Sequence, residues 1–82
     1  MDESIRRILT EHGRIPVDLS TLDDEADLFE HGLTSHANVN VLLALEEEFD
    51  VEFPEEMLRR STFESIAAIR AALGQLVAEA PS

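Results

Sequence analysis

Asp27-Leu28-Phe29-Glu30-His31-Gly32-Leu33-Thr34-Ser35-His36 joins an acidic segment to the most apolar stretch of the chain. Gly32 permits a backbone turn that a side chain would penalise, and Leu33 supplies an apolar anchor directly after it. Thr34 or Ser35 then stands where a hydroxyl caps a helix. The free amides and positive dipole end of that helix favour an anion, so a phosphoester on Ser35 would be stabilised there. The alternative is that this serine only caps the helix, which is the commonest use of serine at such a position.

The residues after this turn predict a helix from Ser35 to Phe49. They show no alternation of apolar and polar positions, and the acidic run Glu46 to Glu48 continues it with strong helix formers. At about 3.6 residues per turn, the apolar side chains divide into two arcs. We assign the first arc to the core; it consists of Val41, Leu42, Leu45 and Phe49.

The second arc, Val39 and Leu43, continues the i, i+4 row that begins at Ser35. An apolar strip with polar and acidic neighbours suits the surface of a partner protein. The alternative is that a short third helix covers the strip; we expect Val39 to pack in the core and Leu43 to be exposed. The candidate partner-binding residues are Thr34, His36, Val39, Asn40, Leu43 and Glu47.

The flanking segments complete an all-α fold. A first helix over 2–13 should stop at Gly13, and a long loop, 14–33, carries spaced apolar anchors that predict packing, among them Val17. Pro54 suits the first position of a short helix over 54–60 that directs Met57 and Leu58 to the core. A capping box formed by Ser61 and Glu64 predicts a last helix over 62–77. We therefore expect one domain over 1–82, a four-helix bundle with a long first loop and a short third helix.

Composition restricts the partners. Six arginines and no lysine stand against eighteen acidic residues, and the formal net charge of -12 argues against nucleic acid or an anionic membrane as partner. Basic protein surfaces are the expected partners of a monomeric module. The chain has no cysteine, so any thiol chemistry must come from outside the protein's own side chains. It begins without the basic and apolar segments of a signal peptide, which favours a cytoplasmic location without membrane insertion.

No catalytic or metal site is indicated. Ser35 and His36 are adjacent on the expected helix and do not face each other, so they make no nucleophile and base pair. The spacing of the three histidines matches no metal-ligand set. The acidic residues from Asp23 to Asp27 imitate the start of a calcium loop but lack its glycine and closing glutamate. We expect a protein that is not an enzyme.

The residues set out above resemble the acyl carrier protein family over nearly the whole chain. The segment from Asp27 to Ser35 is similar to the family motif in which glycine and leucine precede an Asp-Ser-Leu triplet. The helix ending Leu45-Glu46-Glu47-Glu48-Phe49 follows the serine at the family's spacing. Further matches, in the family's order, are Val51, Phe53, Pro54, Thr62 and Phe63.

The resemblance implies a four-helix bundle with 4'-phosphopantetheine attached to Ser35 through a phosphodiester. The thiol of this arm would hold an acyl or related group as a thioester and deliver it to enzymes of a fatty-acid, lipid or polyketide pathway. The implied partners are a phosphopantetheinyl transferase and acyl-loading and acyl-using enzymes with basic docking patches.

Two departures from the family flank the serine. Thr34 stands where the family has aspartate, and His36 where it usually has leucine. Because the resemblance gives both positions a role in engaging the transferase, these departures predict a specialised carrier with a dedicated transferase or synthase. The alternative is a carrier-fold protein that is never modified and acts as an acidic docking or regulatory subunit.

Overall fold

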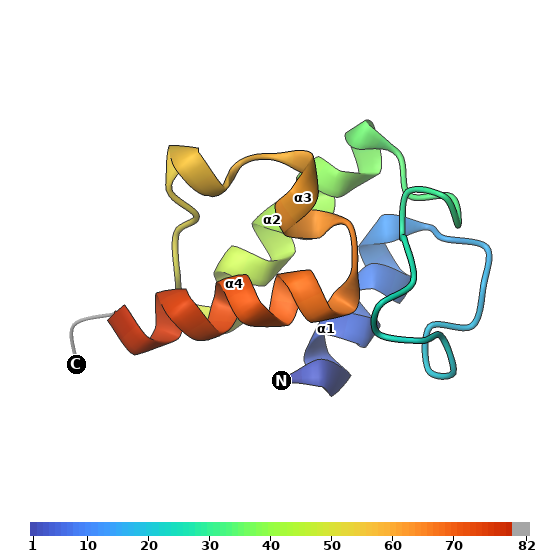
Figure 1. The fold of residues 1–82 in the computed structure, drawn as a ribbon, viewed down its shortest axis with the longest axis horizontal. Coiled ribbons are helices and arrows are strands. Elements are labelled where there is room, and N and C mark those ends of the chain that lie inside the picture. Colours follow the sequence, from blue (N-terminus) through green and yellow to red (C-terminus); the bar gives the residue numbers. More distant parts are fainter. Residues whose placement is uncertain (80–82) are drawn as a thin grey trace.

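The computed structural model describes residues 1–79, and over that range the fold is all-helical, as the sequence predicts. Figure 1 shows the four helices grouped as a bundle, with α4 running along one side. The elements, in order, are α1 (Asp2–Ile8), a π-helical turn (Leu9–Gly13), α2 (Ser35–Phe49), a 3-10 turn (Glu55–Met57), α3 (Arg60–Phe63) and α4 (Ile66–Glu79). Within the described range, none of these helices has the length and apolar character needed to cross a membrane.

The core is shared by α1, α2 and α4: α1 packs against both of the other helices, and all three contribute completely buried aliphatic side chains. From α2 the core receives Val41 and Leu45, which belong to the first apolar arc, and the smaller Ala37. Leu42 and Phe49 of the same arc are only partly buried and pack against the edge of this core. The side chains from the other two helices are Ile5, Ile8, Ile66, Ile69 and Leu73.

The first helical segment ends at Gly13, as the sequence predicts, but its second half is a π-helical turn and not α-helix. Gly13 is buried at the end of the π-helical turn, and Arg14, with φ 53°, is the left-handed residue that ends the helix. A Cβ on Gly13 would meet Leu33 and Val41 at 3.5 Å, so the glycine lies against the core. A Cβ at Gly13 would make only ordinary van der Waals contacts, and the left-handed backbone conformation belongs to Arg14 and not to the glycine.

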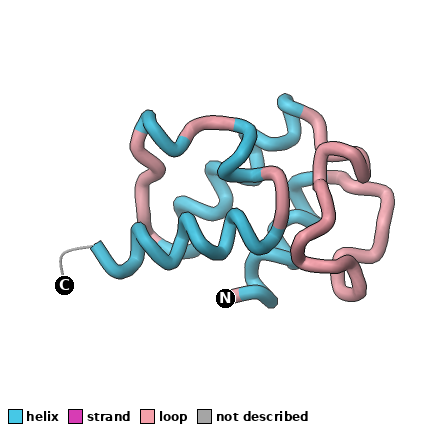
Figure 2. The backbone as a smooth tube through the Cα atoms, in the orientation of Figure 1, coloured by secondary structure: helices cyan, strands magenta, loops and turns pink. Residues whose placement is uncertain are grey.

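The long loop from Arg14 to Thr34 lies at one end of the bundle (Figure 2) and is packed, as its apolar anchors predict. Its buried side chains are Ile15, Leu19, Leu28 and Leu33. The Arg6 guanidinium donates to the backbone carbonyls of Leu19 and Leu22, which fixes the first half of the loop to α1. Val17 was expected among the anchors but is 37% exposed.

Backbone hydrogen bonds join the second half of this loop to the corner between α3 and α4. The Leu28 amide donates to the Glu64 carbonyl at 2.7 Å, and the Ala67 amide donates to the Asp24 carbonyl at 2.8 Å. These bonds satisfy buried backbone groups that a loop of this length must otherwise expose to solvent. These hydrogen bonds therefore fix the position of the segment that leads to Ser35 relative to α3 and α4.

The expected third helix over 54–60 is wrong. The chain forms a 3-10 turn over Glu55–Met57, leaves helical geometry at Leu58 with ψ 64°, and resumes as the one-turn α3. Leu58 was expected in the core but is 50% exposed. Phe53 and Phe63 are buried and anchor the segment instead, through one aromatic contact with ring centroids 5.3 Å apart.

The last helix begins at Ile66, four residues after the predicted start, and the predicted capping box is wrong. Ser65 Oγ accepts a hydrogen bond from the Ala68 amide at 3.0 Å and so satisfies a free N–H at the start of α4. Ser61 lies inside α3, which ends at the buried Phe63, and α4 starts only at Ile66. At its other end α4 continues through Gly74 to Glu79.

Candidate functional site

Ser35 is the first residue of α2, and its neighbour Thr34 caps the helix. Thr34 has extended backbone geometry, and its Oγ1 accepts a hydrogen bond from the Ala37 amide at 3.0 Å. The Thr34 carbonyl accepts from the Asn38 amide at 2.9 Å. Ser35 is exposed, and within residues 1–79 its hydroxyl makes no hydrogen bond. The capping function that the sequence left open between the two residues therefore belongs to Thr34, and the Ser35 hydroxyl remains available.

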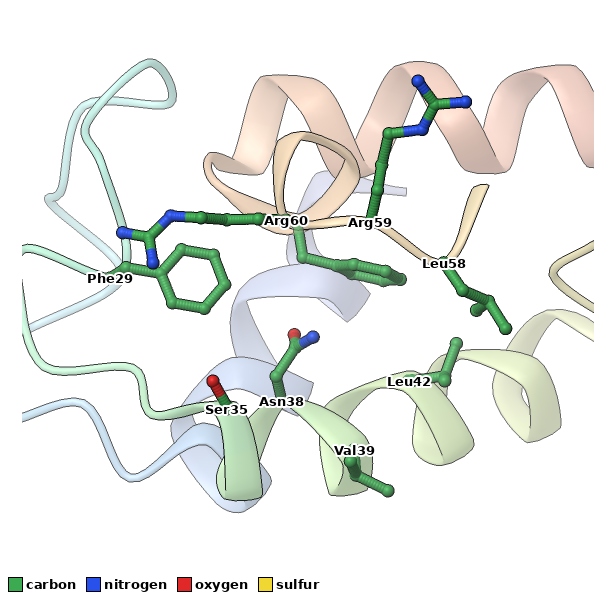
Figure 3. Close-up of a pocket in the computed structure, with 9 residues that line it drawn as sticks. Phe29, Ser35, Asn38, Val39, Leu42, Leu58, Arg59 and Arg60 are labelled. Carbon is green, nitrogen blue, oxygen red and sulfur yellow. The ribbon is translucent and has the colours of Figure 1, made fainter. Parts of the chain in front are cut away.

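The Ser35 hydroxyl lies at the rim of a groove of about 300 Å³ between α2 and the segment that leads into α3 (Figure 3). We call this the α2–α3 groove. Its α2 side is formed by Ser35, Asn38, Val39 and Leu42, and its other side by Leu58, Arg59, Arg60 and Phe63, with Phe29 at the Ser35 end. The floor is mainly apolar, as in small-molecule sites of proteins.

Asn38 brings a polar atom into this groove. Its Oδ1 is buried and has no hydrogen-bond partner within the described residues, the one side-chain atom there with both properties. The side chain points from α2 toward the opposite wall (Figure 3). A buried acceptor without a donor costs free energy, so this atom marks a place where a donor from outside the chain would be stabilised.

Two arginines from the start of α3 differ in direction. The Arg60 guanidinium lies over the Phe29 ring, 4.2 Å from its centroid, at the same end of the groove as Ser35 (Figure 3). Arg59 points away from the groove, and its Nε donates to the Glu56 carbonyl at 2.8 Å. Within the described residues neither guanidinium forms a salt bridge, although the chain carries a net charge of -12.

The second apolar arc is exposed. Val39 is 52% and Leu43 is 56% exposed, so the expected exposure of Leu43 is confirmed and the expected core packing of Val39 is wrong. Val39 remains exposed because Leu58, on the segment that was expected to cover α2, itself faces solvent. The row from Ser35 along α2 is therefore an open surface.

The predicted partner-binding residues do not share one depression. Val39 lines the α2–α3 groove, whereas Leu43 and Glu47 line a second depression between α1 and α2. Thr34, His36 and Asn40 line a third depression beside Gly13 and Arg14. Ser35 and Val39 are thus brought together at one groove, and the others are spread around the outer face of α2.

Sequence reasoning missed Asn38, Arg59 and Arg60. A signal for Asn38 existed, because it is three residues after Ser35 on a helix and therefore lies on the same face. The adjacent arginines at 59 and 60 also stand out in a chain with six arginines in total. The sequence alone could not place them opposite α2, since the predicted third helix had the wrong bounds.

Among residues 1–79 no group of three or more His, Asp or Glu side chains is arranged to hold a metal ion.

Comparison with known proteins gives consistent matches. The family described as "Phosphopantetheine attachment site" matches residues 5–73. An aminoacyl carrier protein from Agrobacterium fabrum is 48% identical over 69 residues, which is 84% of this chain and 83% of the relative.

Solved structures agree with this match. A chain in the crystal structure of an engineered Bradyrhizobium japonicum glycine:[carrier protein] ligase, complexed with carrier protein from Agrobacterium tumefaciens and AMP, superposes with a TM-score of 0.87. It is 44% identical and covers 90% of this chain and 99% of its own length. A solution structure from Agrobacterium tumefaciens gives a TM-score of 0.75 at 42% identity, covering 95% of this chain and 94% of that one.

Proposed function

This chain belongs to the carrier-protein family that has a phosphopantetheine attachment site, and on that premise we propose that Ser35 carries 4'-phosphopantetheine and presents an aminoacyl thioester to partner enzymes. Proteins of this family carry the arm covalently, are not themselves catalysts and work with partner enzymes. The observation that carries the proposal is the division of tasks between Thr34, which caps α2, and Ser35, whose hydroxyl is exposed.

The residues around Ser35 fit the arm. The hydroxyl can form the phosphodiester without loss of the helix cap, and the helix N-terminus favours the negative charge of the phosphate. The orphaned Asn38 Oδ1 beside it fits a group that brings its own hydrogen-bond donors. When bound, the arm supplies the thiol for thioester chemistry, which a chain without cysteine cannot supply itself.

The comparisons support an aminoacyl cargo. The relative from Agrobacterium fabrum is an aminoacyl carrier protein, and the similar Agrobacterium tumefaciens carrier was crystallised with a glycine:[carrier protein] ligase and AMP. We propose that an ATP-dependent amino-acid ligase loads this chain in the same way. A fatty-acid, lipid or polyketide cargo is the alternative, and it requires loading by an acyl-transferring enzyme.

The proposed docking surface for the transferase and the ligase is the outer face of α2. Val39 and Leu43 offer exposed apolar area, and the nearby Glu47 adds negative charge. Basic partner surfaces would be steered to this face by the strongly negative chain.

Stepwise loading followed by mass spectrometry tests the proposal. The purified chain is incubated with coenzyme A and a phosphopantetheinyl transferase, and then with glycine, ATP and a glycine:[carrier protein] ligase. We expect one arm on Ser35 and then one glycyl increment that hydroxylamine removes, with neither gained by Ser35→Ala. A chain that accepts the arm but takes an acyl group from an acyl transferase and no amino acid would contradict the aminoacyl cargo.

A further inference from the structure

We infer that the surface on both sides of Ser35 is a cationic docking site for carboxylates of the enzyme that loads this chain, with Arg14 and Arg60 as its charged contacts. The inference rests on the proposed function, because it concerns the enzyme that loads the arm on Ser35. It reverses the sign of the partner at this end of α2, since the net charge of -12 favours basic partners for the chain as a whole.

Two depressions meet at the start of α2. Ser35 lines the α2–α3 groove, and its neighbours Thr34 and His36 line the depression of about 340 Å³ that also includes Arg14. Among residues 1–79, these two depressions are lined by three of the six arginines and by no carboxylate, although the chain has eighteen acidic residues. The depression between α1 and α2, by contrast, is lined by two glutamates. The attachment residue therefore lies between positive charges in a negative chain.

The two arginines have no partner of opposite charge within the part of the chain that the structure describes. Arg7 and Arg70 bind carboxylates there, whereas Arg14 and Arg60 are exposed and form neither a salt bridge nor a side-chain hydrogen bond. The Arg60 guanidinium rests on the Phe29 ring, which holds its plane and leaves the N–H groups at its edge unused. A guanidinium with free donors is suited to a carboxylate from another protein, which it can bind through two parallel hydrogen bonds.

The backbone at Arg14 points to the same conclusion. Its φ of 53° and ψ of 38° are left-handed, a conformation that costs free energy for a residue with a long side chain. Gly13 would adopt this conformation without that cost, but it lies one residue earlier, inside the helical turn. The fold thus holds an arginine where a glycine would be more stable, and gains no ion pair from its guanidinium. The charge of Arg14 is therefore available to a partner.

The opposite end of α2 has the opposite sign. The last turn and the residue after it contribute Glu46, Glu47, Glu48 and Asp50. An enzyme with carboxylates over Ser35 and basic residues over this acidic end can dock in one direction only, because the reverse direction would bring like charges together. The phosphodiester on Ser35 adds one negative charge, which the two arginines still outweigh. The reversal of charge along α2 thereby directs the arm toward the active site of the enzyme.

Loading kinetics test the inference. The chain with its arm on Ser35, established by mass spectrometry, is supplied with glycine, ATP and a glycine:[carrier protein] ligase. We expect Arg14→Gln and Arg60→Gln each to lower kcat/KM for the carrier roughly three- to tenfold through a higher KM, the scale of one partly exposed charge pair. Arg14→Glu should lower it further. The differences should shrink at about 1 M salt, where charges are screened beyond about 3 Å.

Two control variants separate docking from stability and from net charge. Arg59→Gln removes the same charge from the residue next to Arg60, whose guanidinium points away from the groove, and should leave kcat/KM unchanged. Arg14→Gly should raise the midpoint of urea unfolding, because glycine accepts the left-handed conformation, and yet slow loading as Arg14→Gln does. A variant that is more stable but loaded more slowly would show that Arg14 acts on the partner.

The absence of lysine from the chain permits a direct test of the contact. Arg14→Lys and Arg60→Lys each keep the positive charge and introduce a single side-chain amine. A carbodiimide joins such an amine to a carboxylate only where the two are in contact. We expect fragmentation of the cross-linked complex to locate an amide between position 14 or 60 and an aspartate or glutamate of the ligase, and none from Arg59→Lys.

Three outcomes overturn the inference, and they are distinguishable. If Arg14→Glu and Arg60→Glu are loaded as fast as the unchanged chain and no cross-link forms at either position, the cationic docking site is wrong while the carrier function stands. If these charge reversals speed loading, the enzyme presents basic residues at this end of α2. If the unchanged chain accepts the arm but no amino acid, the proposed aminoacyl function fails, and the docking site fails with it.

Discussion

Thr34 Oγ1 accepts a hydrogen bond from the Ala37 amide, 3.0 Å away, across the first turn of α2. This bond satisfies one of the N–H groups that a helix start leaves without a partner. Because a threonine performs this task, the serine that follows is not required for the helix start. The departure from aspartate at position 34 therefore changes the charge beside the attachment residue while a cap is kept.

The first prediction concerns this cap. Thr34→Ala should lower the free energy of unfolding by about 1 kcal/mol, because the Ala37 amide loses its acceptor. Thr34→Asp should retain a cap and add a favourable charge at the helix N-terminus, worth about 0.3–1 kcal/mol. Urea unfolding followed by circular dichroism measures both. Equal destabilisation by alanine and aspartate would show that the hydrogen bond is not what stabilises the helix start.

The second prediction concerns Gly74, which lies inside α4. A Cβ there would meet no atom within 4 Å, and glycine in a helix interior is less stable than alanine by roughly 0.5–1 kcal/mol. Gly74→Ala should therefore raise the free energy of unfolding by that amount. A neutral or destabilising effect in urea unfolding would indicate that α4 is not continuous through this position.

Alanine at Gly32 should have the opposite effect on stability from alanine at Gly74. It has φ 120°, and a Cβ would approach Pro16 Cδ to 2.7 Å, so Gly32→Ala combines backbone strain with a steric clash. We expect a loss of about 1–3 kcal/mol in the free energy of unfolding. Measured beside Gly74→Ala, it tests whether the turn before Thr34 has the geometry described. Tolerance of alanine at position 32 would contradict that geometry.

A further prediction concerns acid stability. Arg70 bonds Asp2 at 2.8 Å and Asp24 at 3.0 Å, and the hydrogen bond from its guanidinium lowers the pKa of Asp2 below the ordinary value of 3.8. The folded carboxylate binds its proton more weakly than the unfolded one, so this stabilisation is present above pH 3.8 and is lost as pH falls through the lowered pKa. Both groups are solvent-exposed, which keeps the effect small.

Asp2→Asn should therefore destabilise the chain near neutral pH and flatten its loss of stability below about pH 4. Thermal unfolding from pH 7 to pH 3 measures this. Glu3→Gln is the control, because it removes the same charge from α1 at a residue with no ion pair among the described residues. Identical acid profiles for the two variants would count against the Asp2–Arg70 pair.

Asn38 gives a prediction for the chain without its arm. Asn38→Leu removes a buried acceptor that has no donor, so it should raise the free energy of unfolding by roughly 1 kcal/mol. Chemical unfolding of the unmodified chain measures this. A loss of stability would mean that the Asn38 side chain has a structural partner, and the groove would then lack its free acceptor.

Much of the fold was predictable from periodicity and end signals. The second helix has the bounds of α2, because a long apolar run between Gly32 and Asp50 leaves little choice. The buried anchors of the long loop were also visible, apart from Val17, which faces solvent because a single apolar residue in a polar loop need not be buried.

The region from Pro54 to Ser65 could not be predicted, because tertiary contacts decide it. From the sequence, Phe63 is compatible both with the first turn of the last helix and with an aromatic contact to Phe53. In the structure it makes the aromatic contact. The cap then moves to Ser65, which has no glutamate three residues later and so gives no capping-box signal. This region forms one wall of the α2–α3 groove. Because the third helix was predicted with the wrong bounds, Arg60 was not recognised as a site residue.

The most direct test is the intact mass of the chain purified from its native host, with fragmentation to locate any added group. We expect one phosphopantetheine on Ser35, alone or with an aminoacyl increment that hydroxylamine removes. An unmodified chain that also resists several transferases with coenzyme A would contradict the carrier function and favour an unmodified acidic docking subunit. In that case Thr34→Asp and His36→Leu would show whether the two residues beside Ser35 prevent modification.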